Sequence, residues 1–128
     1  MKVLLDTHTF LWLMSDHPGL SATAKQIFLD NDSELLLSAV SGFEIAVKYG
    51  LGKLKLVEPP ATFIRRRIEN NGLLELPISM DHATQLQNLP MHHRDPFDRL
   101  LVAQAMAEAI PLLTADKQLT AYPVECIW

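Results

Sequence analysis

The sequence is poor in cysteine and in long apolar runs, and each shortage excludes a class of protein. Cys126 is the only cysteine among 128 residues, which excludes an intrachain disulfide framework and a zinc site built from several cysteines. The opening run of residues 1–5 meets Asp6 at once and is too short for the apolar region of a signal peptide. No segment approaches the roughly 20 apolar residues that span a bilayer. We therefore expect a cytoplasmic protein with no membrane association.

An excess of positive charge is also missing. The chain carries 11 Lys and Arg against 15 Asp and Glu, for a net charge of −4. Proteins that hold nucleic acid by phosphate neutralisation alone are usually basic, so a nucleic-acid role would need a local patch or a bound metal. Three short basic clusters are candidates, although each is also typical of a solvated face: residues 65–67, the lysines at 48, 53 and 55, and residues 92–94.

Short apolar runs alternate with helical patterns along the chain, and this alternation predicts the fold class. We interpret five runs as strands: residues 3–5, 35–37, 73–76, 112–113 and, at a sheet edge, 124–127. Helices are expected to begin at Ser21, Ser41, Pro59, Ser79 and Asp95. Strands that alternate with helices favour a parallel sheet with right-handed crossovers. We therefore predict one α/β domain over residues 1–128, with a central parallel sheet between helical layers.

Acidic residues occur where the predicted strands end and where the next helices begin. Asp6 follows the first strand directly and Asp116 comes shortly after the fourth, while Glu44 and Asp98 lie in first helical turns. These positions share one rim of a parallel sheet, where ligands bind. Four carboxylates that converged there would repel one another unless a cation neutralised them. Oxygen ligands favour Mg²⁺ or Mn²⁺ over zinc.

Each carboxylate also has a purely structural explanation. Ser41 and Glu44 match a capping box, and Asp98 can complement a helix dipole. Asp6 and Asp116 can bond their own backbone in turns. These explanations are individually the more common ones, so the argument for a metal site depends on all four residues together.

Asp95 differs from Asp98 because it precedes a proline. Aspartate followed by proline at the first helical position is a standard helix start. We interpret Asp95 as a helix cap that can support the site indirectly. Asp98, in the first helical turn, has the better direction for reaching the crevice.

Other enzyme classes lack their motifs in this chain. No P-loop, dinucleotide-binding fingerprint or G-x-S-x-G elbow occurs. A haloacid-dehalogenase phosphatase would need an aspartate where this chain has His8. The histidines lack the spacing of a metal site, and the adjacent His92 and His93 should diverge. Metal-assisted hydrolysis of a phosphodiester is the chemistry that remains.

Four segments carry a family resemblance that covers the whole chain: residues 4–12 (LLDTHTFLW), 41–54 (SGFEIAVKYGLGKL), 94–105 (RDPFDRLLVAQA) and 113–116 (LTAD). In this order and at these spacings they resemble the PIN-domain ribonucleases, and within that family the VapC-type toxins of bacterial toxin–antitoxin pairs. Many members carry Asn or Ser where this chain has His8. That departure leaves the four carboxylates complete.

The resemblance implies a three-layer α/β/α fold and an endoribonuclease that hydrolyses RNA with a metal-activated water. It implies a homodimer and inhibition by a cognate, VapB-like antitoxin. The residues that it implies as ligands of Mg²⁺ or Mn²⁺ are Asp6, Glu44, Asp98 and Asp116. The polar neighbours that would orient ligands or water are Ser41 and Thr114. Candidates for holding the RNA backbone are Lys48, His92, Arg94 and Arg99, with Lys53 as a further possibility.

Two alternative functions fit the same residues. The fold can serve as a binding or scaffold module with little catalysis, although degenerate relatives usually lose acidic residues and this chain keeps all four. It can also be an RNA-processing nuclease with no toxin role. A small adjacent gene for a DNA-binding antitoxin would distinguish the last alternative from a toxin.

Overall fold

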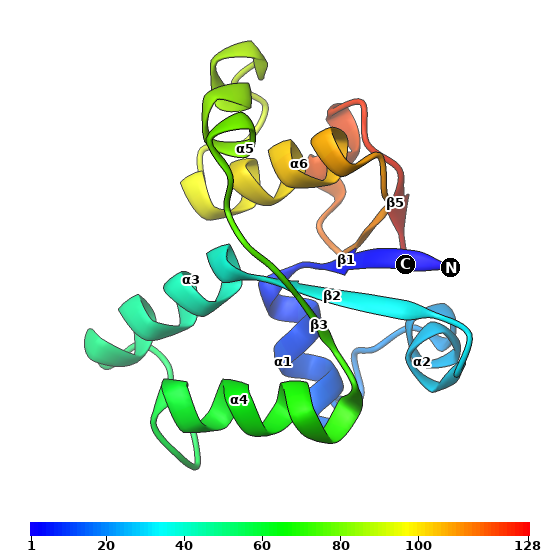
Figure 1. Cartoon of the computed structure of the whole chain (residues 1–128), viewed down its shortest axis with the longest axis vertical. Helices are drawn as coiled ribbons and strands as arrows, with labels where there is room; N and C mark the ends of the chain where they lie inside the picture. The colour runs from blue at the N-terminus through cyan, green and yellow to red at the C-terminus, as the bar shows by residue number, and fades with distance from the viewer.

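The computed structural model describes residues 1–128 and contains a five-stranded parallel sheet with helices on both faces (Figure 1). The strands are β1 (Lys2–Leu5), β2 (Glu34–Ser38), β3 (Leu74–Leu76), β4 (Leu112–Leu113) and β5 (Cys126–Ile127). Their order across the sheet is β3-β2-β1-β4-β5, and every neighbouring pair is parallel. The prediction of a parallel α/β sheet is therefore confirmed, with the last strand at an edge.

Helices connect the strands: α1 (Thr7–Ser15), α2 (Ala22–Leu29), α3 (Ala39–Gly50), α4 (Pro60–Asn71), α5 (Met80–Gln85) and α6 (Pro96–Glu108), with the 3₁₀ helices η1 (Leu86–Asn88) and η2 (Lys117–Ala121). The predicted starts at Ser21, Pro59, Ser79 and Asp95 are confirmed. A bilayer-spanning helix would have to be longer and more apolar than any of these.

Two helix starts differ from the expectation. The predicted cap at Ser41 is wrong, because β2 passes directly into α3 and Ser38 caps that helix by accepting a hydrogen bond from the Val40 N–H at 2.9 Å. Helix α1 has no counterpart among the predicted starts. It begins immediately after Asp6, whose carboxylate caps it. In both places strand and helix join without a loop, so no turn residue marks the junction.

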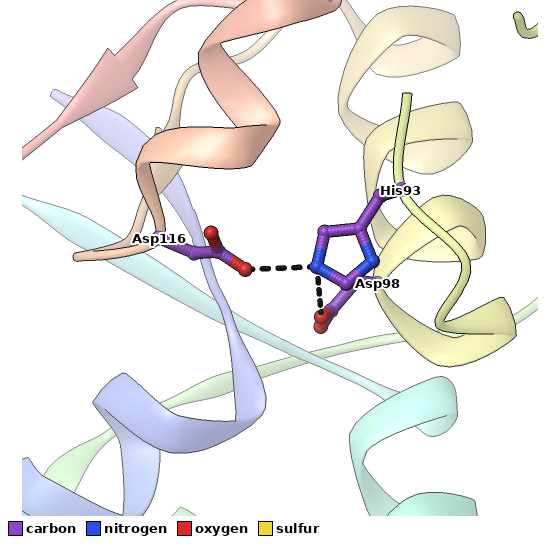
Figure 2. A group of neighbouring side chains, drawn as sticks. All are labelled: His93, Asp98 and Asp116. Carbon is purple, nitrogen blue, oxygen red and sulfur yellow. Dashed lines mark hydrogen bonds and ion pairs between the residues drawn. The ribbon is translucent and has the colours of Figure 1, made fainter. Parts of the chain in front are cut away.

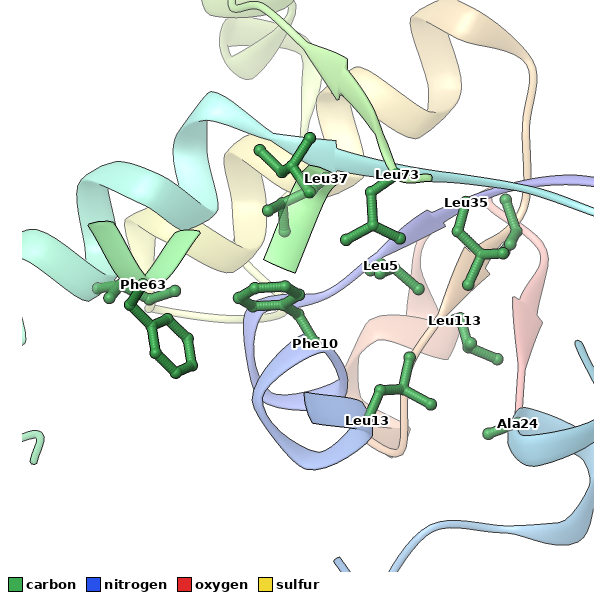
Figure 3. Packing of buried hydrophobic residues seen from close by; sticks show 12 residues of the cluster. Leu5, Phe10, Leu13, Ala24, Leu35, Leu37, Phe63, Leu73 and Leu113 are labelled. Carbon is green, nitrogen blue, oxygen red and sulfur yellow. The ribbon is translucent and has the colours of Figure 1, made fainter. Parts of the chain in front are cut away.

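The core lies on both faces of the sheet, as the continuous apolar runs indicate. On one face, Leu5 and Leu113 pack with Phe10 of α1 and Phe63 of α4 (Figure 3). On the other face, Leu4 and its neighbours pack against α6 in a second cluster. Burial on both faces fixes the strand register, because a shift of one residue would exchange the two sets of side chains.

The chain order places a crevice at the centre of the sheet. From β1 the chain moves outward through β2 to β3, and it returns on the other side of β1 with β4 and β5. The carboxyl ends of β1 and β4 are therefore adjacent at a topological switch point, which is where open α/β sheets bind ligands. The Asp6 N–H donates to the Leu113 carbonyl oxygen at 3.2 Å across this point.

Candidate functional site

A cleft of about 440 Å³ opens at the switch point, and acidic side chains dominate one side of it. The structure brings all four predicted carboxylates to this cleft, with Asp95 as a fifth: Asp6, Glu44, Asp95, Asp98 and Asp116. They come from the ends of β1 and β4, from the start of α6 and from α3, where Glu44 lies in the second turn rather than the predicted first because the helix begins at Ala39. The convergence follows from the parallel topology, because it places these chain positions at one rim.

Asp6 is both a helix cap and a cleft residue. Its Oδ1 accepts a hydrogen bond from the Thr9 N–H at 2.7 Å, and its Oδ2 accepts one from the hydroxyl of Thr114. The buried Thr114 Oγ1 in turn accepts from the Asp116 N–H at 3.0 Å. The structural and functional explanations of Asp6 are thus compatible, because the capping bond fixes the direction of the carboxylate.

Ser41 connects two of the elements that meet at the cleft. Its side chain is fully buried, and its Oγ accepts a hydrogen bond from the Thr7 hydroxyl at 2.8 Å. Thr7 lines the cleft, whereas Ser41 lies behind it. Ser41 therefore holds the start of α1 against the start of α3.

Glu44 is the single carboxylate of α3 and is buried. Its side chain is only 6% exposed and its Oε2 accepts a hydrogen bond from the ammonium of Lys48, one helical turn later. Its Oε1 is buried without any hydrogen-bond partner. The same contact with Glu44 raises the pKa of Lys48, against the opposing effect of its burial. A buried oxygen without a donor is costly, so Oε1 has the character of a free ligand.

Asp98 carries the largest electrostatic perturbation in the cleft. Burial, and after it the neighbouring carboxylates Asp95, Asp6 and Glu44, together raise its pKa to about 7. The His93 ring acts in the opposite direction. Burial and the repulsion between carboxylates therefore favour the protonated form of Asp98. A divalent cation would relieve this repulsion, and the oxygen-rich donor set fits a hard cation.

His93 is the site residue that sequence reasoning missed. Its Nδ1 accepts a hydrogen bond from the Asp95 N–H at 3.0 Å, and its Nε2 lies 3.0 Å from Asp116 Oδ2 and 3.4 Å from Asp98 Oδ2 (Figure 2). Because Nδ1 uses its lone pair on the amide, Nε2 carries the proton. The ligand atoms of these three residues lie within 4.8 Å of one another, but His93 donates to the carboxylates in this arrangement.

The two adjacent histidines diverge, as predicted, with His93 rather than His92 turned to the site. The exposed His92 ring packs edge-on against Tyr122, with centroids 5.1 Å apart. The Tyr122 hydroxyl accepts a hydrogen bond from the His93 N–H at 3.0 Å. The available sequence signal was the position of His93 two residues before an Asp-Pro helix start, where a side chain can reach the capping residue's own amide.

Asp95 caps α6 as predicted. Its Oδ1 accepts hydrogen bonds from the N–H groups of Phe97 at 2.8 Å and Asp98 at 3.3 Å. It also lines the cleft and raises the pKa of Asp98. Asp95 therefore contributes charge to the site in addition to its capping role.

The basic candidates are distributed unevenly around the cleft. Lys48 lines it, and Lys53 joins Lys48 at a smaller adjoining pocket of about 230 Å³. His92, Arg94 and Arg99 do not line the cleft. Arg99 instead donates from Nη2 to the Leu89 carbonyl oxygen at 3.1 Å, which holds the segment before α6. Of the four predicted RNA contacts, Lys48 is the one at the carboxylates.

Comparison with known proteins agrees with this geometry. A family model described as the PIN domain matches residues 3–125. The chain belongs to the PIN-domain family. It is similar to Ribonuclease VapC22 of Mycobacterium tuberculosis, with 28% identity over 120 residues that cover 94% of this chain and 91% of VapC22. It is 42% identical to Ribonuclease VapC16 of the same organism over 71 residues, which cover 52% of this chain and about half, 49%, of VapC16.

Solved structures share this PIN fold over nearly the whole chain. VapBC2 from Rickettsia felis, bound to a DNA fragment from its promoter, matches with a TM-score of 0.74 and 18% identity, covering 99% of this chain and 98% of that one. FitAcB from Neisseria gonorrhoeae matches with a TM-score of 0.66, 18% identity and coverage of 98% and 96%. These likenesses confirm the three-layer α/β/α architecture of the PIN-domain chain.

Proposed function

We propose that this PIN-domain chain is an endoribonuclease that requires Mg²⁺ or Mn²⁺, and that residues 1–128 form a single nuclease domain. The observation that carries the proposal is the cleft itself, where four carboxylates converge and Glu44 Oε1 is buried without a partner. The names of the relatives VapC16 and VapC22, both ribonucleases, support the choice of RNA as substrate.

Asp6, Glu44, Asp98 and Asp116 would hold the cation, directly or through water. The raised pKa of Asp98 and the unpartnered Glu44 oxygen both fit a bound positive charge. When bound, the ion supplies a more acidic water and positive charge opposite the phosphodiester. Because the ion supplies the positive charge, a protein with a net charge of −4 can act on a polyanion.

The protein's own groups orient the reactants around that cation. The Thr114 hydroxyl fixes Asp6, and the His93 Nε2–H fixes Asp116. Glu44 Oε1 accepts no hydrogen bond within the protein, so it would be available to the cation or to a water bound to that cation. Lys48 places its ammonium at the cleft, where it attracts the phosphate group of the substrate.

We further propose that the chain is the toxin of a VapBC-type pair, acting as a homodimer and inhibited by an antitoxin that covers the acidic cleft. Support comes from the structural neighbours, which include VapBC2 and a toxin–antitoxin complex from Klebsiella pneumoniae at a TM-score of 0.65 and 19% identity, covering 98% of this chain and 96% of that one. A cationic side chain of a partner would complement the carboxylates. Co-expression with the product of an adjacent small gene, followed by purification, tests this part.

The nuclease proposal is tested with purified protein, RNA and a choice of metal. We expect cleavage with Mg²⁺ or Mn²⁺ and none with EDTA, with 5′-phosphate and 3′-hydroxyl ends on the products. Asp6→Asn keeps the capping oxygen and the fold but should abolish cleavage. Glu108→Gln, which alters a carboxylate outside the cleft, is the matched control and should cleave normally. Equal cleavage by Asp6→Asn and wild type would refute the assignment.

A further inference from the structure

The acidic cleft is also lined by aromatic side chains, which have no part in the proposed hydrolysis. The two tryptophans of the chain, Trp12 and Trp128, line the same cleft as the carboxylates. Their ring centroids are 6.2 Å apart and their planes are inclined by 53°. We call this pair the tryptophan wall. It comes from opposite ends of the sequence, which indicates that the fold assembles it.

The fold holds Trp12 in place from one side. His17 stacks on its ring at 4.1 Å between centroids, with the planes 6° apart. The Gly19 N–H donates to His17 Nδ1 at 2.8 Å, which orients that imidazole. A Cβ at Gly19 would lie 2.6 Å from the Trp12 ring, so the backbone itself closes on the indole. The ring is therefore preorganised, with His8 of the same helix meeting it edge to face at 4.7 Å.

Trp12 lies outside the core, where it packs on the segment that follows α1. It belongs to neither of the two hydrophobic clusters of the core. Its aromatic contacts are with His8, His17 and Trp128, and of these Trp128 packs against one of the core clusters. A large apolar ring held at the edge of an acidic cleft is typical of a surface that binds a ligand.

Trp128 is tied to the catalytic end of β4. It follows β5, the edge strand that pairs with β4, and the Thr114 N–H donates to the Ile127 carbonyl oxygen at 3.0 Å. Thr114 is the residue whose hydroxyl holds Asp6. Thr114 therefore links the tryptophan wall to the carboxylates, because its N–H bonds to the residue before Trp128 and its hydroxyl bonds to Asp6.

We propose that the tryptophan wall stacks a base of single-stranded RNA whose phosphate lies at the carboxylates. This inference rests on the proposed nuclease function. A nucleotide is a ligand that combines an anionic phosphate with a flat apolar ring, and the cleft presents a matching surface for each. Unpaired bases stack on tryptophan rings, whereas the bases of a duplex are already stacked on one another. The wall would thus select single strands, with little preference among the four bases.

The test uses tryptophan fluorescence, because each variant of the wall leaves one indole as reporter. Asp98→Asn protein, which should not cleave, is titrated with a short single-stranded oligoadenylate in Mg²⁺. Emission from Trp12 in a Trp128→Phe background should be quenched saturably. Trp12→Leu should weaken oligoadenylate binding by roughly 10- to 100-fold, while Trp12→Phe keeps a flat ring and most of the affinity. Tyr49→Leu, an exposed aromatic outside the cleft, is the control.

An oligonucleotide with a base removed separates stacking from a folding defect. If the wall holds a base, the penalty of Trp12→Leu should disappear for an oligonucleotide that lacks the base at one position. Unchanged affinity in Trp12→Leu, or a penalty that persists in full with every abasic probe, would overturn the proposal. Failure of the nuclease proposal is seen separately, as wild-type protein that binds and quenches but cleaves no RNA in either metal.

Discussion

His82 and His93 form the same pattern of hydrogen bonds in two different parts of the molecule. In each ring Nδ1 accepts a backbone N–H at a helix start, from Ser79 at 3.1 Å and from Asp95 at 3.0 Å. Each Nε2 then faces a carboxylate, Glu108 at 3.2 Å for His82 and Asp116 at 3.0 Å for His93. One local device thus fixes the tautomer and direction of both rings.

The surroundings decide what each ring does. His82 is 4% exposed and packs between α5 and α6, where the amide of Gln104 also approaches its Nδ1 at 3.3 Å. Its carboxylate partner stands alone, near the end of α6. His93 faces two carboxylates of a crowded acidic cleft. The comparison teaches that a hydrogen-bonded histidine is structural or functional according to the number of charges at its far nitrogen.

The largest expected effect comes from replacing each histidine's carboxylate partner by the corresponding amide. Asp116→Asn should lower RNA cleavage by more than about 100-fold, because removal of a group that merely supports a metal ligand already costs about 10- to 100-fold. Glu108→Gln should leave cleavage within about twofold. Initial rates on one RNA in Mn²⁺ measure both. Similar losses in the two variants would show that the histidines are equivalent.

Removal of the two rings should affect different properties. We expect His82→Ala to lower the free energy of unfolding by about 2–3 kcal/mol, because it leaves buried polar groups without partners. Its binding of Mn²⁺ should be unchanged. Urea denaturation monitored by circular dichroism gives the first quantity and calorimetric titration the second. A weakened Mn²⁺ affinity in a fully folded sample would contradict the structural role.

His93→Phe should give the opposite result. The free energy of unfolding should fall by only about 1 kcal/mol, because Phe fills the space of the ring and the His93 side chain is more exposed than that of His82, at 13% against 5%. Mn²⁺ affinity should fall about 10-fold, at the low end of the range for groups that orient a metal ligand. His93→Gln, which can still donate from a terminal amide, should recover part of that affinity. Equal binding by wild type and His93→Phe would exclude a positioning role.

The smallest expected effect is on the pH dependence of stability. It arises from Asp98, which lies among the crowded carboxylates near His93, whereas His82 has no such cluster beside it. The pKa of Asp98 rises from 3.8 to about 7 on folding, so the folded protein binds a proton more tightly than the unfolded chain. The resulting contribution to stability is present below about pH 4 and is lost as the pH rises through 7. In EDTA, the free energy of unfolding of wild type should therefore decline over this range. In Asp98→Asn the free energy of unfolding should decline less with pH. An identical decline in the variant and the wild type would show that Asp98 is not the group responsible.

The sheet could be predicted well from the sequence because each strand is marked by a local run of apolar residues. Apolar runs such as 3–5 and 35–37 mark strands buried on both faces, and the chain order of strands and helices then places the acidic residues at one rim. Asp95 was recognised as a cap from two letters, because proline restricts the first helical turn. These inferences needed no knowledge of distant contacts.

The features that were missed depend on contacts between distant elements. The direction of His93 requires the Tyr122 hydroxyl beneath its backbone, and no local pattern reports that neighbour. Ser41 matched a capping box, but Ser38 at the end of β2 already caps the helix, which therefore begins earlier. Arg99 looked like an RNA contact, whereas the fold directs it to the Leu89 carbonyl oxygen.

The hydrogen bond between Thr114 and Asp6 joins residues 108 positions apart. A ribosome must therefore deliver nearly all 128 residues before this bond can form. While β4 is still inside the exit tunnel, the local capping bond from the Thr9 N–H is available to Asp6, but the bond from Thr114 is not. The acidic cleft is therefore incomplete until β4 has been synthesised and has paired with β1. The long-range closure of the site thus separates the synthesis of Asp6 from the assembly of the cleft around it.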